Sequence, residues 1–178
     1  MEKKLKRKTI YKGRIITLAV DRVKTKSRTS SREFIKHPGS SVILPVINKD
    51  PVQILLIRQY RYAAGEYLYE LPAGTRDPNE SALQCARREL KEETGFKAGR
   101  MKKIISFYPS PGISTEFMDV FCAYGLTPSA AQKDPDEIIT TKKISLQDAL
   151  SMIKTGRIKD AKTTASILYF KLSRENRK

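Results

Sequence analysis

Residues 74–96 read GTRDPNESALQCARRELKEETGF, and this segment decides both the fold and the chemistry expected of the chain. Three of its five acidic residues, Glu89, Glu92 and Glu93, stand close together. The chain as a whole is strongly basic, with 35 Lys and Arg against 19 Asp and Glu. A basic chain that gathers carboxylates in one short segment needs a physical reason to do so.

Capping signals predict a helix within this segment. Asn79 is expected to cap the N-terminus and Gly95 to end the helix, which would then run from about Glu80 to Thr94. At about 100° per residue, Glu93 falls within roughly 60° of Glu89, and Glu92 lies about 60° to one side. The three carboxylates are therefore expected at the edge of the buried face, not on the outer face.

These carboxylates have few basic neighbours at helical spacing. Arg88 stands four residues before Glu92, but no base lies three or four residues from Glu89 within the helix. Like charges at this spacing destabilise a helix by roughly 0.2–0.5 kcal/mol per pair. A solvated acidic stripe is the alternative interpretation. A hard divalent cation explains the cluster better, because Mg²⁺ and Mn²⁺ prefer oxygen ligands and also bind phosphate.

The segment resembles the Nudix box, the signature of hydrolases that act on nucleoside diphosphates linked to another moiety. The box residues with fixed identity are filled here by Gly74, Glu80, Arg88, Glu89, Glu92, Glu93 and Gly95. Leu90 and Phe96 fill the aliphatic and the aliphatic-or-aromatic positions, so the match extends over all 23 residues. The resemblance implies an α/β protein, a Nudix-type α/β/α sandwich with a mixed β-sheet and an N-terminal β-extension.

The resemblance also implies how the box residues act. Two to three Mg²⁺ (or Mn²⁺) ions would be bound by the carbonyl of Ala73 and the carboxylates of Glu89, Glu92 and Glu93. Arg88 would hold the carboxylates in place by ion pairing. Gly74 would permit the sharp turn before the loop, and Glu80 would brace that loop or reach a metal through water. The ions would neutralise the diphosphate and activate a water molecule, which makes Arg88 and the three glutamates the catalytic group.

The flanking segments resemble the ADP-ribose pyrophosphatase branch of the family over most of the chain, notably at residues 32–46, 56–74, 106–123 and 155–170. This resemblance implies Mg²⁺-dependent hydrolysis of ADP-ribose, or of related ADP-sugars, to AMP and ribose 5-phosphate. Arg58 and Arg61 are expected to contact the diphosphate, since guanidinium binds phosphate bidentately; a surface role is the alternative. Glu70 is expected to contact a metal or the ribose, or to be only a strand-edge acid.

Two loops after the box complete the expected site. The Ser-Pro-Gly turn carries Pro111, at the position that the branch favours, and Glu116 follows as a substrate or metal contact. The second loop contains the acids Asp134, Asp136 and Glu137. Each is a candidate for positioning or deprotonating the attacking water, and Glu137 is the predicted catalytic residue.

Composition sets the wider context. The formal net charge of +16 attracts anions, so nucleotides are expected partners and nucleic acid is a possible one that is not favoured. Cys85 and Cys122 lie in apolar patterns, typical of buried thiols in a reducing compartment. No apolar run reaches the ~20 residues of a membrane span and no secretory signal is visible, so we expect a cytoplasmic protein with no membrane association.

Turn signals and apolar periodicity predict the remaining elements. Strands are expected near residues 14–26, 31–37, 41–48, 52–60, 67–74, 102–112, 117–126 and 137–146, and helices near 145–156 and 160–172. We expect an extension at residues 1–40 that contributes to dimerisation and substrate contact, and a Nudix hydrolase domain at 41–178. The resemblance implies a homodimer with exchanged N-terminal strands.

Two alternatives to ADP-ribose hydrolysis remain at this stage. A Nudix hydrolase could act on another nucleoside diphosphate derivative, such as a dinucleotide, an oxidised nucleotide or an RNA 5′ end. A non-catalytic module could bind nucleic acid through its basic termini. The complete box favours an enzyme, because a protein that only binds phosphate gains nothing from clustered carboxylates beside it.

Overall fold

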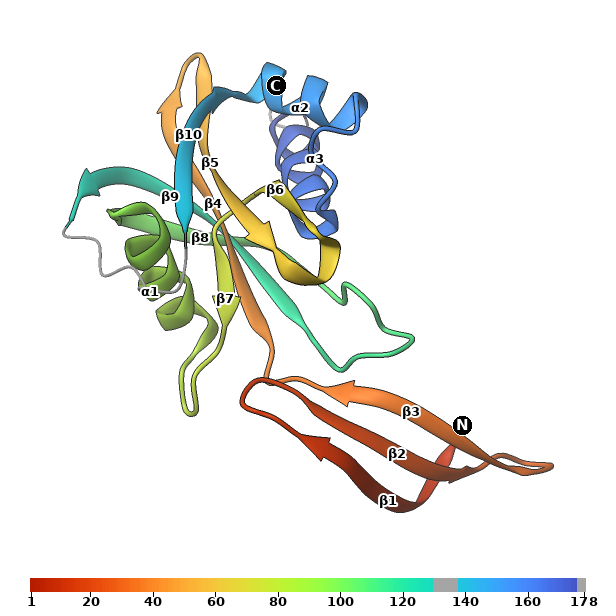
Figure 1. Cartoon of the computed structure of the whole chain (residues 1–178). Coiled ribbons are helices and arrows are strands. Elements are labelled where there is room, and N and C mark those ends of the chain that lie inside the picture. Colours follow the sequence, from red (N-terminus) through yellow and green to blue (C-terminus); the bar gives the residue numbers. More distant parts are fainter. Residues whose placement is uncertain (130–137, 176–178) are drawn as a thin grey trace.

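A computed structural model of the chain describes residues 1–129 and 138–175, which form two β-sheets and three α-helices. The small N-terminal sheet has the antiparallel order β1-β2-β3 and lies apart from the rest in Figure 1. Its strands are β1 (Lys3–Lys12), β2 (Thr17–Lys24) and β3 (Thr29–Lys36). Sequence patterns indicated only an exposed start before residue 14, but the first strand already begins at Lys3, and all of its residues are exposed.

The large sheet has seven strands in the order β10-β5-β4-β9-β8, with β6 paired to β5 and β7 paired to β4. Its strands are β4 (Ser40–Lys49), β5 (Val52–Arg61), β6 (Glu66–Glu70), β7 (Ala73–Thr75), β8 (Phe96–Phe107), β9 (Met118–Pro128) and β10 (Ile139–Ser145), and a short 3₁₀ turn, Tyr62–Ala64, joins β5 to β6. The pair β4–β9 is parallel and the other pairs are antiparallel. The sheet is therefore mixed, as expected.

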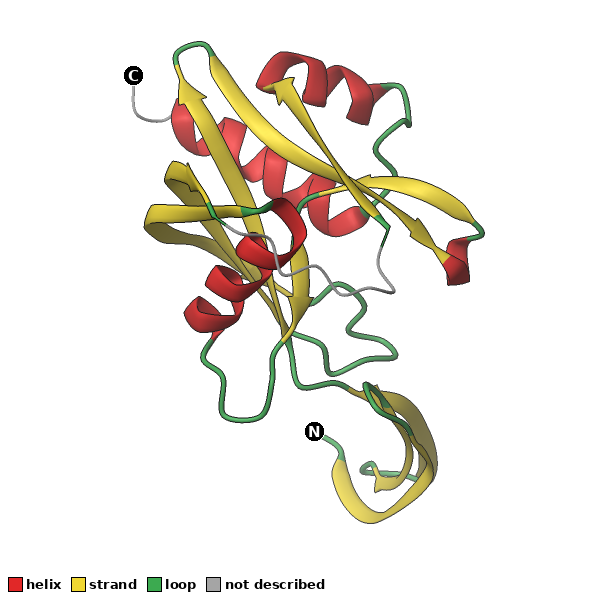
Figure 2. Ribbon diagram, turned by 60° about the vertical axis from the view of Figure 1, so that its left-hand side comes forward, coloured by secondary structure: helices red, strands yellow, loops and turns green. Residues whose placement is uncertain are grey.

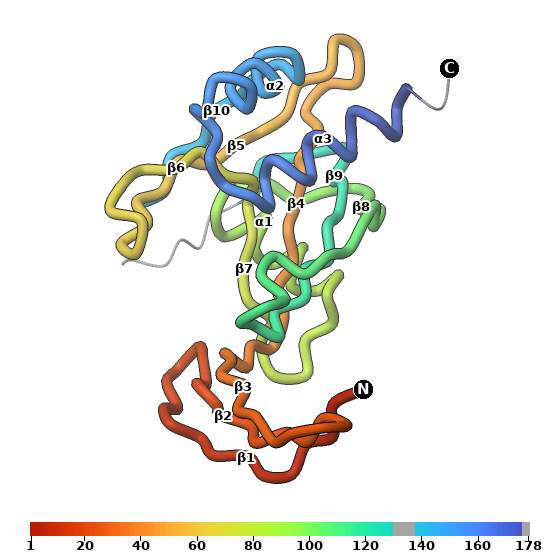
Figure 3. The backbone as a smooth tube through the Cα atoms, turned by 90° about the vertical axis from the view of Figure 1, so that its right-hand side faces the viewer, coloured from red at the N-terminus to blue at the C-terminus, as the bar shows by residue number. Residues whose placement is uncertain are grey.

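Helices cover both faces of this sheet (Figures 1 and 3). The helices are α1 (Ala82–Thr94), α2 (Leu146–Lys154) and α3 (Ala161–Glu175). Side chains alternate across β4: Val42 and Leu44 belong to the core beneath α2 and α3, whereas Ile43 packs with Ala86 and Leu90 of α1. Two apolar layers on opposite sides of one sheet make an α/β/α sandwich, which confirms the predicted fold class.

Local details around the box differ from the sequence expectation. The helix begins at Ala82 and not at Glu80, because Ser81 is the N-cap and forms a capping box with Gln84. Asn79 instead adopts a left-handed conformation in the preceding loop. The single strand expected at residues 67–74 is divided into β6 and β7, which pair with different strands on either side of Leu71 and Pro72. Finally, β8 starts at Phe96, six residues earlier than expected.

A short connection at residues 37–39 joins the small sheet to the sandwich (Figure 2). The loop between β8 and β9 also contacts β3: Ile35 N–H donates to the Ile113 carbonyl and Thr115 N–H donates to the Ile35 carbonyl. Within the described part of the chain, no helix has the length and apolar character needed to cross a membrane.

Candidate active site

The acidic side of α1 packs against the turn that leaves β7. Glu89 and Glu93 are 9% and 5% exposed, which confirms that these carboxylates border the buried face. One oxygen of Glu93 accepts a 2.9 Å hydrogen bond from Ala73 N–H. Gly74 is required for this packing, because a Cβ atom there would stand only 1.8 Å from Glu89 Oε1. The importance of Gly74 is thus the close approach of the Glu89 carboxylate to its backbone.

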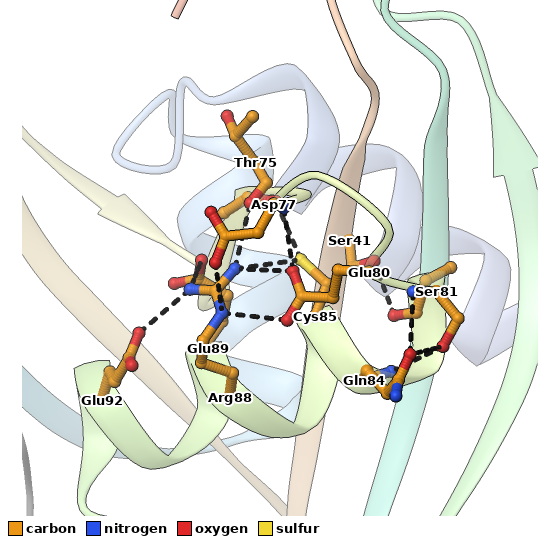
Figure 4. A network of polar contacts seen from close by, with 12 residues as sticks. Ser41, Thr75, Asp77, Glu80, Ser81, Gln84, Cys85, Arg88, Glu89 and Glu92 are labelled. Atoms are coloured by element: carbon orange, nitrogen blue, oxygen red, sulfur yellow. Dashed lines mark hydrogen bonds and ion pairs between the residues drawn. The ribbon is translucent and has the colours of Figure 1, made fainter. Parts of the chain in front are cut away.

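Arg88 is the centre of the polar network in Figure 4. Its Nη1 donates to Glu89 Oε1 at 2.6 Å and to Glu92 Oε2 at 3.0 Å. Its Nε and Nη2 donate to the two oxygens of Glu80 at 3.0 and 2.9 Å, and Nη2 also donates to the Thr75 carbonyl. The sequence suggested few basic partners for the carboxylates, but this single guanidinium contacts Glu89 and Glu92 of the cluster. It also contacts Glu80, the loop backbone and, at 3.6 Å, Asp77.

Glu80 lies in the loop just before α1 and ties that loop to the helix. Besides its paired contact with Arg88, its Oε2 accepts a hydrogen bond from Asp77 N–H at 3.0 Å. The bracing of the loop expected of Glu80 is therefore present. The hydrogen bond from Arg88 lowers the pKa of Glu80 and is the largest influence on it, and the same contact raises the pKa of Arg88. Both groups remain charged around neutral pH.

Cys85 faces the same turn. Its thiol lies 3.4 Å from the Gly74 carbonyl and is fully buried. Burial raises the pKa of the Cys85 thiol to about 11, with the nearby charges of Glu80 and Glu89 acting in the same direction. The thiol is therefore neutral at physiological pH and is not activated as a nucleophile.

The donor atoms in this region fit a hard divalent cation. Glu89, Glu92 and Glu93 supply carboxylate oxygens and Ala73 supplies a backbone carbonyl, the ligand types that Mg²⁺ and Mn²⁺ prefer. Among residues 1–129 and 138–175, however, no group of three or more His, Cys, Asp or Glu side chains is already placed to hold a metal ion. In this arrangement the guanidinium of Arg88 contacts both Glu89 and Glu92.

Glu70 is not a strand-edge acid. It is 1% exposed and accepts hydrogen bonds from Arg61 Nε at 2.7 Å and Arg61 Nη2 at 2.8 Å. Lys162 of α3 forms a second ion pair with it. Burial alone would raise the pKa of Glu70, but hydrogen bonds from Arg61 and the charge of Lys162 outweigh burial and lower it. A direct substrate contact through Glu70 would require these pairs to separate.

The two candidate arginines of β5 differ in direction, because residues three apart on a strand point to opposite faces. Arg61 shares a face with Glu70, and the charge of Glu93 helps to raise the pKa of Arg61 after the larger effect of its hydrogen bond to Glu70. The guanidinium of Arg58 instead lies 4.3 Å from the centre of the Tyr67 ring. The two side chains therefore cannot bind one phosphate from the same face of the sheet, and Arg61 is the one whose pKa is affected by Glu93.

The loop between β8 and β9 carries the other predicted contacts. Pro111 is exposed in a turn closed by Ile113 and Ser114 N–H groups, which donate to the Ser110 carbonyl. Glu116 is anchored where the two sheets meet: it accepts a 2.5 Å hydrogen bond from Ser40, and its Oε1 lies 3.8 Å from His37 Nδ1. The predicted catalytic residue Glu137, with Asp134 and Asp136, lies outside the described residues.

Sequence patterns missed two residues of α3 that hold the segment entering the site. Thr163 Oγ1 accepts a hydrogen bond from Leu71 N–H at 2.7 Å, and Lys162 binds Glu70 at the end of β6. The spacing of residues in α3 could have revealed Lys162. Ser166 follows it by four residues and Phe170 by eight, so all three lie on the buried face of the helix. A lysine at such a position needs a buried acidic partner, although its spacing does not say which one.

The sequence of this chain is similar to those of known proteins over most of its length. The family profile described as the NUDIX domain matches residues 36–167, about three quarters of the chain. The methanol dehydrogenase activator of Bacillus methanolicus is 36% identical over 174 residues, covering 96% of this chain and 93% of that protein. The ADP-ribose pyrophosphatase of Bacillus subtilis (strain 168) is 35% identical over 174 residues with the same coverage.

A solved structure titled as an ADP compounds hydrolase superposes on this chain with a TM-score of 0.86. The match covers 99% of this chain and 95% of that one, at 20% sequence identity. At this identity the likeness shows a shared fold, and it includes the N-terminal sheet as well as the sandwich.

Proposed function

The chain belongs to the Nudix hydrolase family, and from this premise we propose that it hydrolyses the diphosphate bond of ADP-ribose or a related ADP-sugar. The products from ADP-ribose are AMP and ribose 5-phosphate. The observation that carries the proposal is the 35% identity with an ADP-ribose pyrophosphatase over 96% of the chain, since it extends beyond the box to the N-terminal sheet and to α3.

The proposed catalytic group consists of the box residues. Glu89, Glu92 and Glu93, with the Ala73 carbonyl, would hold Mg²⁺ or Mn²⁺, two to three ions in each site, and Arg88 keeps the carboxylates together. Bound there, the metal would neutralise the diphosphate and lower the pKa of a water molecule. Support comes from the contacts of Arg88 with Glu89 and Glu92 and from the packing of Glu89 on Gly74.

Substrate contacts are proposed for residues outside the box. Arg61 is the favoured phosphate contact, because Glu70 holds its Nε and Nη2 while Nη1 makes no hydrogen bond to Glu70. Pro111 and Glu116 are proposed to border the substrate at the edge nearest the small sheet. Glu137 is proposed to accept the proton of the attacking water. Arg58, turned to the opposite face, is the least supported of these contacts.

We also propose that two chains associate through the extension at residues 1–40 and exchange N-terminal strands. The large apolar side chains of Ile10, Tyr11, Ile15 and Ile16 are exposed around the β1–β2 turn. Apolar residues gathered at one end of a small sheet favour burial against a partner. Both cysteines are free and buried, consistent with a cytoplasmic protein.

The test is AMP release from ADP-ribose with Mg²⁺, comparing the wild-type protein with Glu93→Gln. Loss of turnover with an unchanged melting temperature is the expected result. Glu66→Gln is the matched control, because it makes the same chemical change at an exposed pair with Lys159. ADP-glucose, NADH and diadenosine polyphosphates serve as competing substrates. Inert ADP-ribose with rapid cleavage of another compound would refute the substrate and leave the family chemistry intact.

A further inference from the structure

One face of the small sheet is unusually cationic because of a β-bulge. Lys4 pairs with Val23 and Lys6 pairs with Arg22, so Leu5 is an extra residue in β1. Side chains alternate along a regular strand, and this bulge resets the alternation. Consequently Lys3, opposite Lys24, lies on the same face as Lys6, which lies opposite Arg22. Lys8 continues the row along β1.

This arrangement places like charges directly opposite each other in two successive cross-strand pairs, Lys3–Lys24 and Lys6–Arg22. Such pairs destabilise a sheet. Two carboxylates of the small sheet are used on the opposite face, where Asp21 pairs with Arg7 and Glu2 pairs with Arg32. The third, Glu33, lies opposite Val20 on the same face as these cations, is exposed, and forms no ion pair with them. Five cations lie on this face: Lys3, Lys6, Lys8, Arg22 and Lys24. Among the described residues they form no ion pair, and all five are exposed.

The cationic face is defined here as Lys3, Lys6, Lys8, Arg22 and Lys24. Its charge is part of a wider excess, since residues 1–40 contain 13 Lys and Arg against 3 Asp and Glu, a net +10 of the chain's +16. Cations two residues apart on a strand are separated by about 6.7 Å, and the neighbouring row is about 4.8 Å away. Regularly spaced cations of this kind match a linear polyanion better than one small anion.

We propose that the cationic face binds the phosphate backbone of single-stranded RNA. The proposed contacts are with phosphates alone, so binding would be independent of sequence and governed by counterion release. This activity is separate from diphosphate hydrolysis and does not rest on it, because none of the five cations belongs to the proposed active site.

The observations favour RNA over an anionic membrane. A membrane-binding surface combines cations with apolar side chains that enter the lipid. Apart from Met1 and Leu5, the exposed large apolar residues of the small sheet lie around the β1–β2 turn, at the other end of the hairpin. That end adjoins the sandwich, whereas the cations extend away from it towards the β2–β3 turn (Figure 1).

The test measures fluorescence anisotropy of a labelled polyuridylate oligomer over a series of salt concentrations. The full-length wild type is compared with a triple variant, Lys6→Gln, Arg22→Gln and Lys24→Gln. The matched control is Lys4→Gln, Lys12→Gln and Lys36→Gln, which removes the same charge from the opposite face. Thermal unfolding accompanies both, and the first triple is expected to be at least as stable as wild type because it relieves cation pairs.

Contact with all five cations predicts a slope of log K against log salt of about −3.5, and loss of three contacts predicts about −1.4. The control triple should keep the wild-type slope. Equal losses in the two triples would overturn the proposal, because net charge alone would then explain binding. So would absence of RNA binding, or binding only to phosphatidylserine vesicles run in parallel.

Discussion

Replacing Gly74 by Ala tests the tightest packing in the candidate site. The added Cβ would lie 1.8 Å from Glu89 Oε1, 2.0 Å from Cδ and 2.6 Å from Oε2. To reach an ordinary contact of 3.4 Å, the carboxylate must move by about 1.6 Å. The backbone of Gly74 is not in the left-handed region, so the substitution acts through this collision and not through backbone strain.

The consequence should fall on activity more than on stability. A carboxylate at the end of a flexible side chain can turn away, and replacing Gly by Ala restricts the unfolded chain, so the free energy of unfolding should change by no more than about 1 kcal/mol. A displacement of about 1 Å in a catalytic group costs roughly 100-fold in rate, or about 2.7 kcal/mol of activation free energy. We therefore expect Gly74→Ala to lose at least that factor in kcat for ADP-ribose.

The assay is steady-state AMP release at saturating ADP-ribose over a range of Mg²⁺ concentrations, together with urea unfolding. Gly99→Ala is the control, because a Cβ there would approach the Gly125 carbonyl only to 3.5 Å. If Gly74→Ala folds with wild-type stability and keeps more than half of the wild-type kcat, the position of Glu89 against the turn is not required for catalysis.

Three further predictions concern buried groups. Lys162→Met breaks the buried pair with Glu70 and should cost about 3 kcal/mol in the free energy of urea unfolding; no measurable loss would contradict the inferred burial. The pKa of Glu70 is lowered from its ordinary 4.5 in the folded protein, so its contribution to stability is complete above that pH and is lost as the pH falls through the folded value. Glu70→Gln should therefore flatten the acid limb of a stability–pH profile, and an unchanged limb would show that Glu70 does not titrate with unfolding. Burial raises the pKa of Cys85 and Cys122 to about 11, so both thiols should resist iodoacetamide at neutral pH until urea unfolds the chain; rapid alkylation of the native protein would refute this.

Local patterns were sufficient for much of the fold. Alternation along β4, with Val42 and Leu44 on one face and Ile43 on the other, specifies a strand between two apolar layers, and the box specifies α1. The start of α1 was misplaced because Asn79 and Ser81 are both good capping residues. Only the reciprocal bond between Ser81 and Gln84 decides between them. The first strand was missed because β1 has no buried residue, so no hydrophobic period marks it.

Residues of the site that lie near one another in sequence were predicted, whereas distant partners were not. Arg88 and the glutamates share one helix, so their proximity follows from helical geometry. Lys162 and Glu70 are 92 residues apart, and their contact exists only because α3 packs across the sheet beside β6. The opposite directions of Arg58 and Arg61 could have been foreseen, since strand alternation separates residues at odd spacing.

Arg88 explains how Glu80, Glu89 and Glu92 can lie together in the described arrangement. Its Nη1 is shared by Glu89 and Glu92, whereas Nε and Nη2 are held by both oxygens of Glu80. Among the nitrogens of Arg88, a cation that binds Glu89 and Glu92 therefore competes with Nη1, and the paired contact with Glu80 keeps Arg88 in place. The same guanidinium can offset repulsion before a metal binds and brace the loop afterwards. Glu80 is consequently the residue that separates these two functions of Arg88.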